Sequence, residues 1–435
     1  MALLQNNMSA QNSKSKLSYN DTWMRSTLSA SQKINPSEIF DARKTLIKLI
    51  DSDEQGWMSI TDNKTHLAEI NKAYEKFKNF KNCLVIGIGG SDLGARAIIE
   101  ALRKQDSKIK IWFTGDTTDP DEIESIFSQI PWKQTCINII SKSGGTLEPM
   151  ASFFLAKERL EKAVGVKKAV KAILCTTDPE KGALLEFARE NNYATLSIPQ
   201  NIGGRFSVLT AVGLFPLKMA GIDITKLRLG ASQMRDSWLK HFGTSHAIDQ
   251  FAAWHVSHGR SNRPMHVLMI YSKALHGMGM WWRQLWAESL GKSSAAGGPT
   301  PIIFLGPTDQ HSQLQLYQDG PDDKVYTFLE IEKFNQKIKV PNSIKNIPSL
   351  NYALKHDFSD LIHSAAQGTA IALKDKNKPV GIINIKNINE NSLGELIMFL
   401  QIATAVAGNL YCINPFNQPG VEDSKNRVKE LLTNN

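Results

Sequence analysis

The stretch Cys83-Leu-Val-Ile-Gly-Ile-Gly-Gly-Ser-Asp-Leu-Gly94 decides the fold class of this 435-residue chain. An apolar run typical of a buried strand leads directly into glycines, a serine and a helix-like segment. Glycines let backbone N–H groups approach an anion, and a helix N-terminus adds positive potential. The dinucleotide fingerprint GxGxxG fails at Asp92, and the Walker pattern is missing. The stretch predicts a strand–turn–helix unit whose turn either binds a phosphate or is a tight turn without a ligand.

Similar apolar runs recur further along the chain, each followed by a turn and a helical pattern. They begin at Ile109, Cys136, Ala172 and Thr195, and, after a helical region at about 207–259, at Met265, Ile302, Val325 and Val380. This alternation favours βαβ units and parallel sheets that are buried on both faces. Residues 1 to about 80 show helical patterns and no strand signal. The predicted fold class is therefore α/β, with two doubly wound parallel-sheet domains and helical N- and C-terminal arms.

The change along the chain from helical patterns to alternating strand and helix patterns also suggests where the domains begin and end. We expect an N-terminal helical arm at 1–80, a first domain at 81–220, a second at 221–412 and a C-terminal arm at 413–435. Hydrophobic residues make up 42% of the chain and charged residues 21%, which excludes a mainly disordered or fibrous protein. The formal charge of +9 fits attraction of small anions as well as of nucleic acid. Since no basic run with interleaved aromatics occurs, nucleic acid is not an expected partner.

The cysteines and the longest apolar stretch bear on the compartment. The four cysteines form no CxxC pair and lie in apolar stretches, so we expect buried, reduced thiols. The stretch Leu396–Ile413 contains polar residues and two glycines, and is interpreted as a buried helix running into a strand rather than a membrane span. The N-terminus lacks the features of a signal peptide. We therefore expect a cytoplasmic protein that does not contact membranes.

A second loop, Ser141-Lys-Ser-Gly-Gly-Thr-Leu-Glu-Pro149, also follows a strand and precedes a helix. The hydroxyls of Ser141, Ser143 and Thr146 and the ammonium of Lys142 suit a phosphate monoester. The alternative is a flexible turn in which Thr146 caps the following helix. The absence of a nearby Mg²⁺-binding carboxylate motif favours a sugar phosphate over a nucleotide.

A third loop, Asn201-Ile-Gly-Gly-Arg-Phe-Ser207, has two glycines that leave room for a ligand beside the guanidinium of Arg205. Such an arginine can stabilise a developing oxyanion, or it can be a structural surface residue. The spacing His255-x-x-His258 lacks the acidic or cysteine partners of a metal site. No metal and no cofactor are therefore predicted.

Together, the three loops resemble those of the glucose-6-phosphate isomerase family. The resemblance continues in Trp281-Trp-Arg-Gln-Leu-Trp-Ala-Glu-Ser-Leu-Gly-Lys292, in Thr308-Asp-Gln-His-Ser312 and in Asn414-Pro-Phe-Asn-Gln-Pro-Gly-Val-Glu-Asp-Ser-Lys425. It extends from about residue 80 to 430 in the family's order and is similar to the shorter bacterial type. It implies two sugar-isomerase (SIS) domains and a homodimer with each active site at the subunit interface.

The resemblance also implies a reaction, the reversible isomerisation of glucose 6-phosphate and fructose 6-phosphate by ring opening and proton transfer through a cis-enediolate. It assigns proton transfer to Glu288, ring opening to His311 and Lys425, and enediolate stabilisation to Arg205. The substrate-binding positions that it implies are Gly90, Ser91, Ser141, Lys142, Ser143, Thr146, Gln284 and Gln418. The apolar neighbours Trp281, Trp282, Leu285 and Trp286 are expected to desolvate the carboxylate of Glu288. Gln284 precedes Glu288 by one helical turn and is expected to face the same site.

Two alternatives remain at this stage. A related isomerase could act on another sugar phosphate, such as mannose 6-phosphate. A non-catalytic SIS module that only senses sugar phosphates would be expected to lack Glu288, His311 or Lys425, and all three are present.

Overall fold

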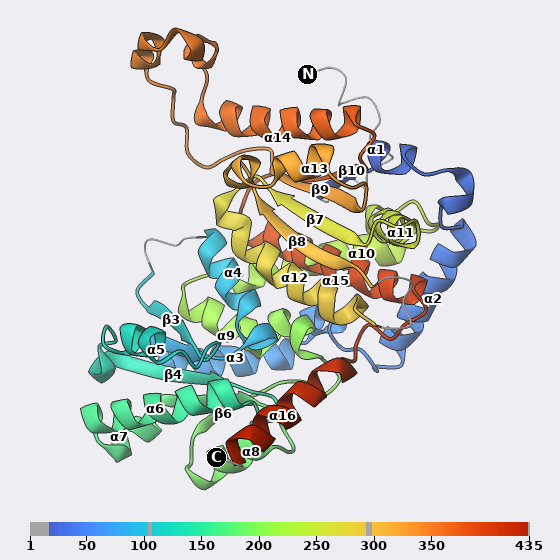
Figure 1. Cartoon of the computed structure of the whole chain (residues 1–435). Coiled ribbons are helices and arrows are strands. Elements are labelled where there is room, and N and C mark those ends of the chain that lie inside the picture. Colours follow the sequence, from blue (N-terminus) through green and yellow to red (C-terminus); the bar gives the residue numbers. More distant parts are fainter. Residues whose placement is uncertain (1–16, 103–106, 293–297, 434–435) are drawn as a thin grey trace.

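Two five-stranded sheets organise the chain, and helices cover their faces (Figure 1). The structure, a computed structural model, describes residues 17–102, 107–292 and 298–433. The first sixteen residues of the expected N-terminal arm and the last two of the C-terminal arm therefore lie outside the described residues. The two largely parallel sheets confirm the predicted α/β class.

The first sheet is entirely parallel and has the strand order β3-β2-β4-β5-β6. Its strands are β2 (Asn82–Ile86), β3 (Lys110–Thr114), β4 (Thr135–Ile140), β5 (Ile173–Thr177) and β6 (Ala194–Ser197). Its helices are α4 (Leu93–Leu102), α5 (Pro120–Phe127), α6 (Leu147–Val164), α7 (Val166–Val170) and α8 (Ala183–Glu190). The order reverses between β2 and β4, and ligands of such sheets bind beyond the strand ends at this switch point. The loops 87–92 and 141–146 follow these two strands.

The second sheet has the order β1-β10-β9-β7-β8 and is parallel except for β1. Its strands are β1 (Leu17–Asn20), β7 (Met265–Ile270), β8 (Thr300–Leu305), β9 (Lys324–Ile331) and β10 (Val380–Ile385). The expectation that the first 80 residues hold no strand is wrong for β1, which pairs antiparallel with β10. Four residues place only two side chains on each face, too few for a periodic signal, and the strand forms because the edge of β10 offers backbone partners.

Helices from both ends of the chain surround the sheets. The remaining helices are α1 (Thr22–Ser26), α2 (Pro36–Asp51), α3 (Lys64–Phe77), α9 (Ala211–Met219), α10 (Ile224–Lys240), α11 (Ala247–Arg260), α12 (His276–Leu290), α13 (Leu314–Asp319), α14 (Phe358–Asp375), α15 (Glu390–Leu410) and α16 (Glu422–Thr433). Helix α15 packs against α2, α10, α11 and α12. It is long and apolar enough to cross a membrane, but 94% of its most apolar window is buried inside the protein. Its burial is that of a core helix.

The chain beyond α15 departs from two expectations. The predicted helix is confirmed, but the strand expected after it is wrong, because the chain turns at Tyr411 and Cys412. Cys412 has a backbone φ of 58° and an exposed side chain, whereas Cys83, Cys136 and Cys175 are buried as expected. A left-handed residue commonly ends a helix, and here it directs the thiol to the surface.

Two segments lie outside the packed body. The loop with the short 3₁₀ helices η8 (Asn342–Asn346) and η9 (Pro348–Ala353) projects from the second sheet, in orange-brown in Figure 1. Helix α16 buries none of its residues. We call the first segment, residues 335–357, the projecting arm.

Candidate functional site

Helix α12 has a buried face and a face that carries polar groups. Gln284 and Glu288 lie one turn apart, and Nε2 of Gln284 donates to Oε1 of Glu288 over 2.9 Å. The side chain of Glu288 is 34% exposed. The apolar neighbours that are expected to desolvate it are fully buried in the core: Trp281, Trp282, Leu285 and Trp286. Trp281 and Leu285 precede Glu288 by seven and three residues and so share its side of the helix, and desolvation of the carboxylate by these neighbours stays a prediction.

Arg205 brings the glycine-rich third loop to this carboxylate. It lies in the 3₁₀ helix η5 (Gly204–Leu209), and its side chain is only 2% exposed. Nη1 lies 3.3 Å from Oε2 of Glu288 and donates to Oε1 of Gln418 over 2.8 Å. Nε donates to Oγ of Ser289 over 2.8 Å. Burial lowers the pKa of Arg205, and the negative charge of Glu288 partly offsets that effect. The arginine is therefore a fixed, buried cation beside the proposed base.

The C-terminal loop completes this cluster. Nη2 of Arg205 donates to the carbonyls of Pro415 and Asn417, over 2.6 and 3.0 Å. These bonds hold the loop that supplies Gln418. The structure thus brings three of the predicted residues, Arg205, Glu288 and Gln418, into direct contact, with Gln284 bonded to Glu288.

The first glycine loop packs closely against the cluster. A Cβ at Gly90 would lie 2.2 Å from the carbonyl oxygen of Gly204, so only glycine allows this approach. Gly89 has a φ of 59°, and a Cβ there would lie 2.7 Å from Nε2 of Gln284. Gly90 and Ser91 belong to the 3₁₀ helix η3 (Gly89–Ser91), which opens toward α4. The first loop therefore meets both the third loop and helix α12.

Asp92, which follows this turn, is buried and forms an ion pair with Arg96 over 3.0 Å. Burial nevertheless raises its pKa to about 6.

The serine-rich loop holds itself in shape. Oγ of Ser141 accepts from the N–H of Gly144 over 3.0 Å, and Oγ of Ser143 accepts from the N–H of Gly145 over 3.2 Å. A hydroxyl that accepts one hydrogen bond keeps its own proton to donate. Thr146 is the N-cap residue of α6, but its side chain makes no capping hydrogen bond. These three hydroxyls thus have donor capacity for a ligand.

Lys142 connects the serine-rich loop to the third loop. Its Nζ donates to the carbonyl oxygens of Gln200 and Ile202, over 2.8 and 3.1 Å. Burial lowers the pKa of this ammonium group. In the structure Lys142 therefore ties two candidate ligand loops together, and its third N–H is the one left to reach a phosphate.

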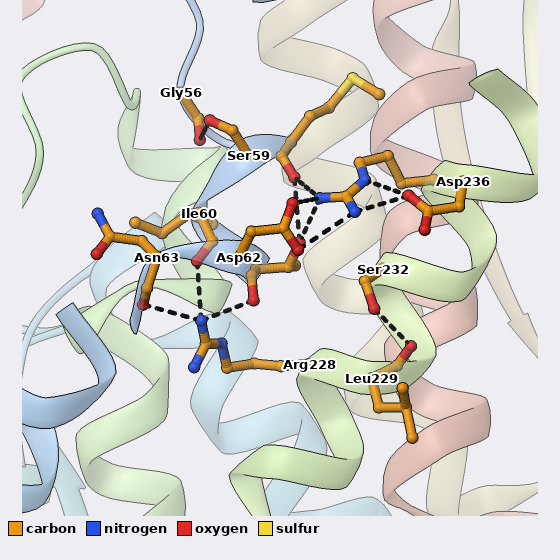
Figure 2. A network of polar contacts seen from close by, with 12 residues as sticks. Gly56, Ser59, Ile60, Asp62, Asn63, Arg228, Leu229, Ser232 and Asp236 are labelled. Atoms are coloured by element: carbon orange, nitrogen blue, oxygen red, sulfur yellow. Dashed lines mark hydrogen bonds and ion pairs between the residues drawn. The ribbon is translucent and has the colours of Figure 1, made fainter. Parts of the chain in front are cut away.

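A layer of packing and ion pairs supports Arg205 from behind. Trp57 packs on Phe206 with ring centroids 5.0 Å apart, and the carbonyl of Asn201 accepts from the N–H of Gly56. Two arginines of α10 hold the same segment. Figure 2 shows Arg228 donating to carbonyls around the 3₁₀ helix η2 (Ser59–Asp62), and Arg235 pairs with Asp62 over 2.6 Å. The position of Arg205 thus depends on packing that reaches across to the N-terminal segment.

A cavity of about 580 Å³ opens beside the cluster. It is lined by Glu288, Gly291, Lys292, Cys412, Ile413, Asn414, Asn417, Gln418, Pro419, Gly420 and Val421. Oε1 of Gln284 is buried and has no partner among the described residues. A buried acceptor without a donor is costly, and a ligand hydroxyl would satisfy it. Within the described ranges, no group of three or more metal-ligating side chains occurs.

Two predicted residues lie apart from the cluster. His311 is an exposed residue of the 3₁₀ helix η7 (Thr308–His311), beyond the second sheet. Lys425 lies on α16, is 61% exposed and pairs with Glu422 over 2.8 Å. Among the contacts of the described residues, none joins either side chain to Glu288 or Arg205.

The sequence reasoning missed two polar groups of the cluster. Ser289 accepts from Arg205, and Lys292 donates to the carbonyls of Glu288 and Asn417. The spacing of four residues between Glu288 and Lys292 was an available signal for the second group. Nothing in the sequence distinguished Ser289 from other helical serines.

The two wound sheets, with loops suited to anions at a strand switch point, define a protein of the sugar-isomerase fold class. Residues 63–435 match the phosphoglucose isomerase family, and the chain belongs to that family.

The chain is 36% identical to the glucose-6-phosphate isomerase of Clostridioides difficile over 389 residues, which cover 87% of this chain and 86% of that one. Among solved structures, a hypothetical protein of Thermus thermophilus is similar with a TM-score of 0.82 and 30% identity, covering 91% of this chain and 94% of that one. A glucose-6-phosphate isomerase of Chlamydia trachomatis shares the fold, with a TM-score of 0.72, 22% identity and coverage of 86% and 74%.

Proposed function

We propose that this protein is an isomerase that interconverts glucose 6-phosphate and fructose 6-phosphate, the aldose–ketose step of glycolysis and gluconeogenesis. The contact between Arg205 and Glu288 carries the proposal, because it places a buried cation beside a carboxylate at the rim of a cavity. Membership of the phosphoglucose isomerase family and the 36% identity to an enzyme of that name support it.

The phosphate of the substrate would bind at the switch point of the first sheet. The hydroxyls of Ser141, Ser143 and Thr146 would donate to its oxygens, and the N-terminus of α6 adds positive potential. Lys142 adds a charge, and the turn at Gly90 and Ser91 closes the other side. Gln284 and Gln418 would then contact sugar hydroxyls.

The chemistry follows from the positions of Glu288 and Arg205. In the open-chain aldose, the carboxylate of Glu288 removes the proton from C2, and the electron pair passes through C1 to the carbonyl oxygen. This gives a cis-enediolate whose negative charge the guanidinium of Arg205 stabilises. The hydroxyl proton of O2 then passes to O1, which leaves the negative charge on O2. Return of the proton from Glu288 to C1, with O2 becoming the carbonyl, gives the ketose. The same carboxylate serves both directions, and the step needs no cofactor.

Ring opening requires a second pair of groups, and we assign it to His311 and Lys425. Imidazole exchanges protons near neutral pH, as transfer between the ring oxygen and a hydroxyl requires. Both side chains lie apart from Glu288 in one chain. We infer a homodimer with each active site at the subunit interface, in which a second copy supplies His311.

The surface supports this inference. The projecting arm and the start of α14 expose Ile338, Ile347, Tyr352 and Phe358, and α16 exposes Leu431 and Leu432. Apolar groups gathered on projecting segments are typical of interaction surfaces.

Mixing Glu288→Gln with His311→Ala protein, under conditions in which subunits exchange between dimers, tests whether His311 acts across the subunit interface. Hybrid dimers with one intact site would restore about one quarter of wild-type activity if His311 acts across the interface. No restoration after verified exchange would place both groups in the same chain.

We further infer the division of the chain into the arm 1–80, the domains 81–220 and 221–412 and the terminal arm 413–435. The strands of the first sheet fall within 82–197, and four strands of the second fall within 265–385. Burial of α15 supports a soluble protein, and we propose a cytoplasmic location with neither membrane nor nucleic acid as a partner.

The assay of the proposed activity uses the purified protein with fructose 6-phosphate, and glucose 6-phosphate is detected by a coupled dehydrogenase. Mannose 6-phosphate is tested in parallel, and both reactions are repeated in chelator. We expect conversion of fructose 6-phosphate that is unchanged by chelator. Turnover of mannose 6-phosphate alone would reject the proposed substrate, and no turnover of either would reject the isomerase.

A further inference from the structure

Lys292 joins two elements of the site that are far apart in the sequence. It follows α12 by two residues and is half-buried at the rim of the cavity. Its Nζ donates to the carbonyl oxygen of Glu288 over 2.5 Å and to that of Asn417 over 2.9 Å. One ammonium group thus links the last turn of the helix that carries the base to the C-terminal loop.

The carbonyl of Glu288 lacks a backbone donor, and the side chain of Lys292 supplies a donor instead. Glu288 lies in the last turn of α12, where carbonyls have no intrahelical donor. The backbone N–H of Lys292, four residues on, donates to Leu290 instead. A cation at a helix C-terminus satisfies such a carbonyl and interacts favourably with the helix dipole. The backbone of the proposed base is therefore fixed by a charged group.

The carbonyl of Asn417 accepts from two cations. Nη2 of Arg205 donates to it over 3.0 Å, and Nζ of Lys292 donates over 2.9 Å. Burial lowers the pKa of Lys292, the nearby Arg205 lowers it further, and Glu288 raises it. Two neighbouring cations held on one backbone oxygen fix the loop from two sides, next to Gln418.

We propose that Lys292 is a positioning residue that holds the loop 414–418 against α12, so that Gln418 and Arg205 stay aligned with the carboxylate of Glu288. This inference rests on the proposed isomerase function. Lys292 makes no contact with the reacting atoms in this account. It acts through the backbone of Glu288 and Asn417, and misplacement of reacting groups by about 1 Å lowers rates by about 100-fold.

The test compares Lys292→Met, which keeps the length but removes the charge, with Lys292→Arg, which keeps the charge. Lys378→Met is the control, since Lys378 is a more deeply buried lysine that likewise donates to a backbone carbonyl, that of Gly320, near the start of β10. Steady-state kinetics with fructose 6-phosphate give kcat and KM. Hydrogen–deuterium exchange of the peptide 412–421 reports on the loop and does not depend on activity. Thermal melting confirms that each variant is folded at the assay temperature.

We expect Lys292→Met to lower kcat by about 10- to 100-fold with KM changed less than about threefold, because the phosphate loop is untouched. Exchange in 412–421 should rise while α15 stays protected, and Lys292→Arg should restore most of kcat. Wild-type kcat or unchanged exchange in Lys292→Met would overturn the proposal, as would an equal loss in Lys378→Met. If the wild-type protein does not isomerise the substrate, the proposed function fails, and the exchange result still decides whether Lys292 holds the loop.

Discussion

Nη1 of Arg205 lies 3.3 Å from Oε2 of Glu288. Arg205 follows β6 of the first sheet, whereas Glu288 lies on α12, which follows β7 of the second sheet. The guanidinium is almost fully buried, whereas the carboxylate is one-third exposed and faces the cavity. The cation is therefore fixed by the protein, and the carboxylate is the partner that can reach a substrate. This pair is assembled within a single chain, whereas His311 and Lys425 lie apart from it in the same chain.

Replacement of Arg205 by lysine keeps the charge but loses the planar set of donors that reaches Ser289, Gln418 and two carbonyls. We expect kcat/KM to fall by about 10²- to 10³-fold, because the oxyanion loses its positioned donor. The free energy of unfolding should decrease by about 2–4 kcal/mol, since buried acceptors lose their partners.

Arg43→Lys is the matched control for this prediction. Arg43 is also buried and donates to the carbonyls of Trp238 and His241. Urea unfolding should show a comparable stability loss in both variants, whereas steady-state kinetics should show the activity loss only in Arg205→Lys. Equal kcat/KM in the two variants would contradict the role assigned to Arg205.

Thr146→Ala separates phosphate binding from helix capping. Loss of a hydrogen bond to a phosphate should raise KM about 10- to 100-fold, with kcat nearly unchanged. The free energy of unfolding should hardly change, because Thr146 makes no capping bond. Thr210→Ala is the comparison, since Thr210 caps α9 by accepting from the N–H of Val212 and should lose about 1 kcal/mol. A destabilised Thr146→Ala protein with normal KM would show that Thr146 is only a cap.

The buried histidine His255 predicts a pH dependence of stability. Its Nδ1 lies 2.7 Å from the carbonyl of Phe251, its Nε2 lies 3.0 Å from Thr327, and burial lowers its pKa to about 4. As the pH falls, the imidazole of His255 therefore binds a proton near pH 6.5 in the unfolded chain but only near pH 4 in the folded protein. The contribution of His255 is complete above pH 6.5 and is lost as the pH falls toward 4.

His255→Gln isolates this contribution, because Asp249 and Glu330 have raised pKa values and shift stability in the opposite direction over part of the same range. Urea midpoints measured from pH 7.5 to 4.5 should fall more steeply in wild-type protein than in the variant. Parallel curves for the two proteins would show that the imidazole of His255 does not titrate in this way.

Most of the fold could be predicted because buried parallel strands are continuously apolar. The run beginning at Cys83 became β2, and those beginning at Cys136 and Ala172 became β4 and β5. The edge strand β1 could not be found, since its partner lies more than 360 residues away, as the pairing of Leu17 with Ile385 shows.

Prediction of the site was more uneven. Arg205, Gln284, Glu288 and Gln418 do lie together, because the motifs that carry them sit at loops and helix faces that the fold brings to one edge. The desolvation of Glu288 by the tryptophans of α12 stays a prediction, because these rings are buried while the carboxylate itself is one-third exposed. The role of Lys292 depends on the backbone carbonyl of Asn417. Every residue has such a carbonyl, so a sequence motif cannot indicate which one accepts a hydrogen bond.

The most direct test of the central claim, that Glu288 moves the proton, is isomerisation of fructose 6-phosphate in D₂O by wild-type and Glu288→Gln protein. The amide oxygen can still accept from Arg205, and its NH2 group can donate to Oε1 of Gln284 once that side-chain amide turns over, so the variant should keep its fold. Product from the wild-type protein should carry deuterium at C2 of glucose 6-phosphate. In Glu288→Gln, isomerisation and deuterium incorporation should fall together by about 10²- to 10⁴-fold. Deuterium incorporation at the wild-type rate in the variant would contradict the account.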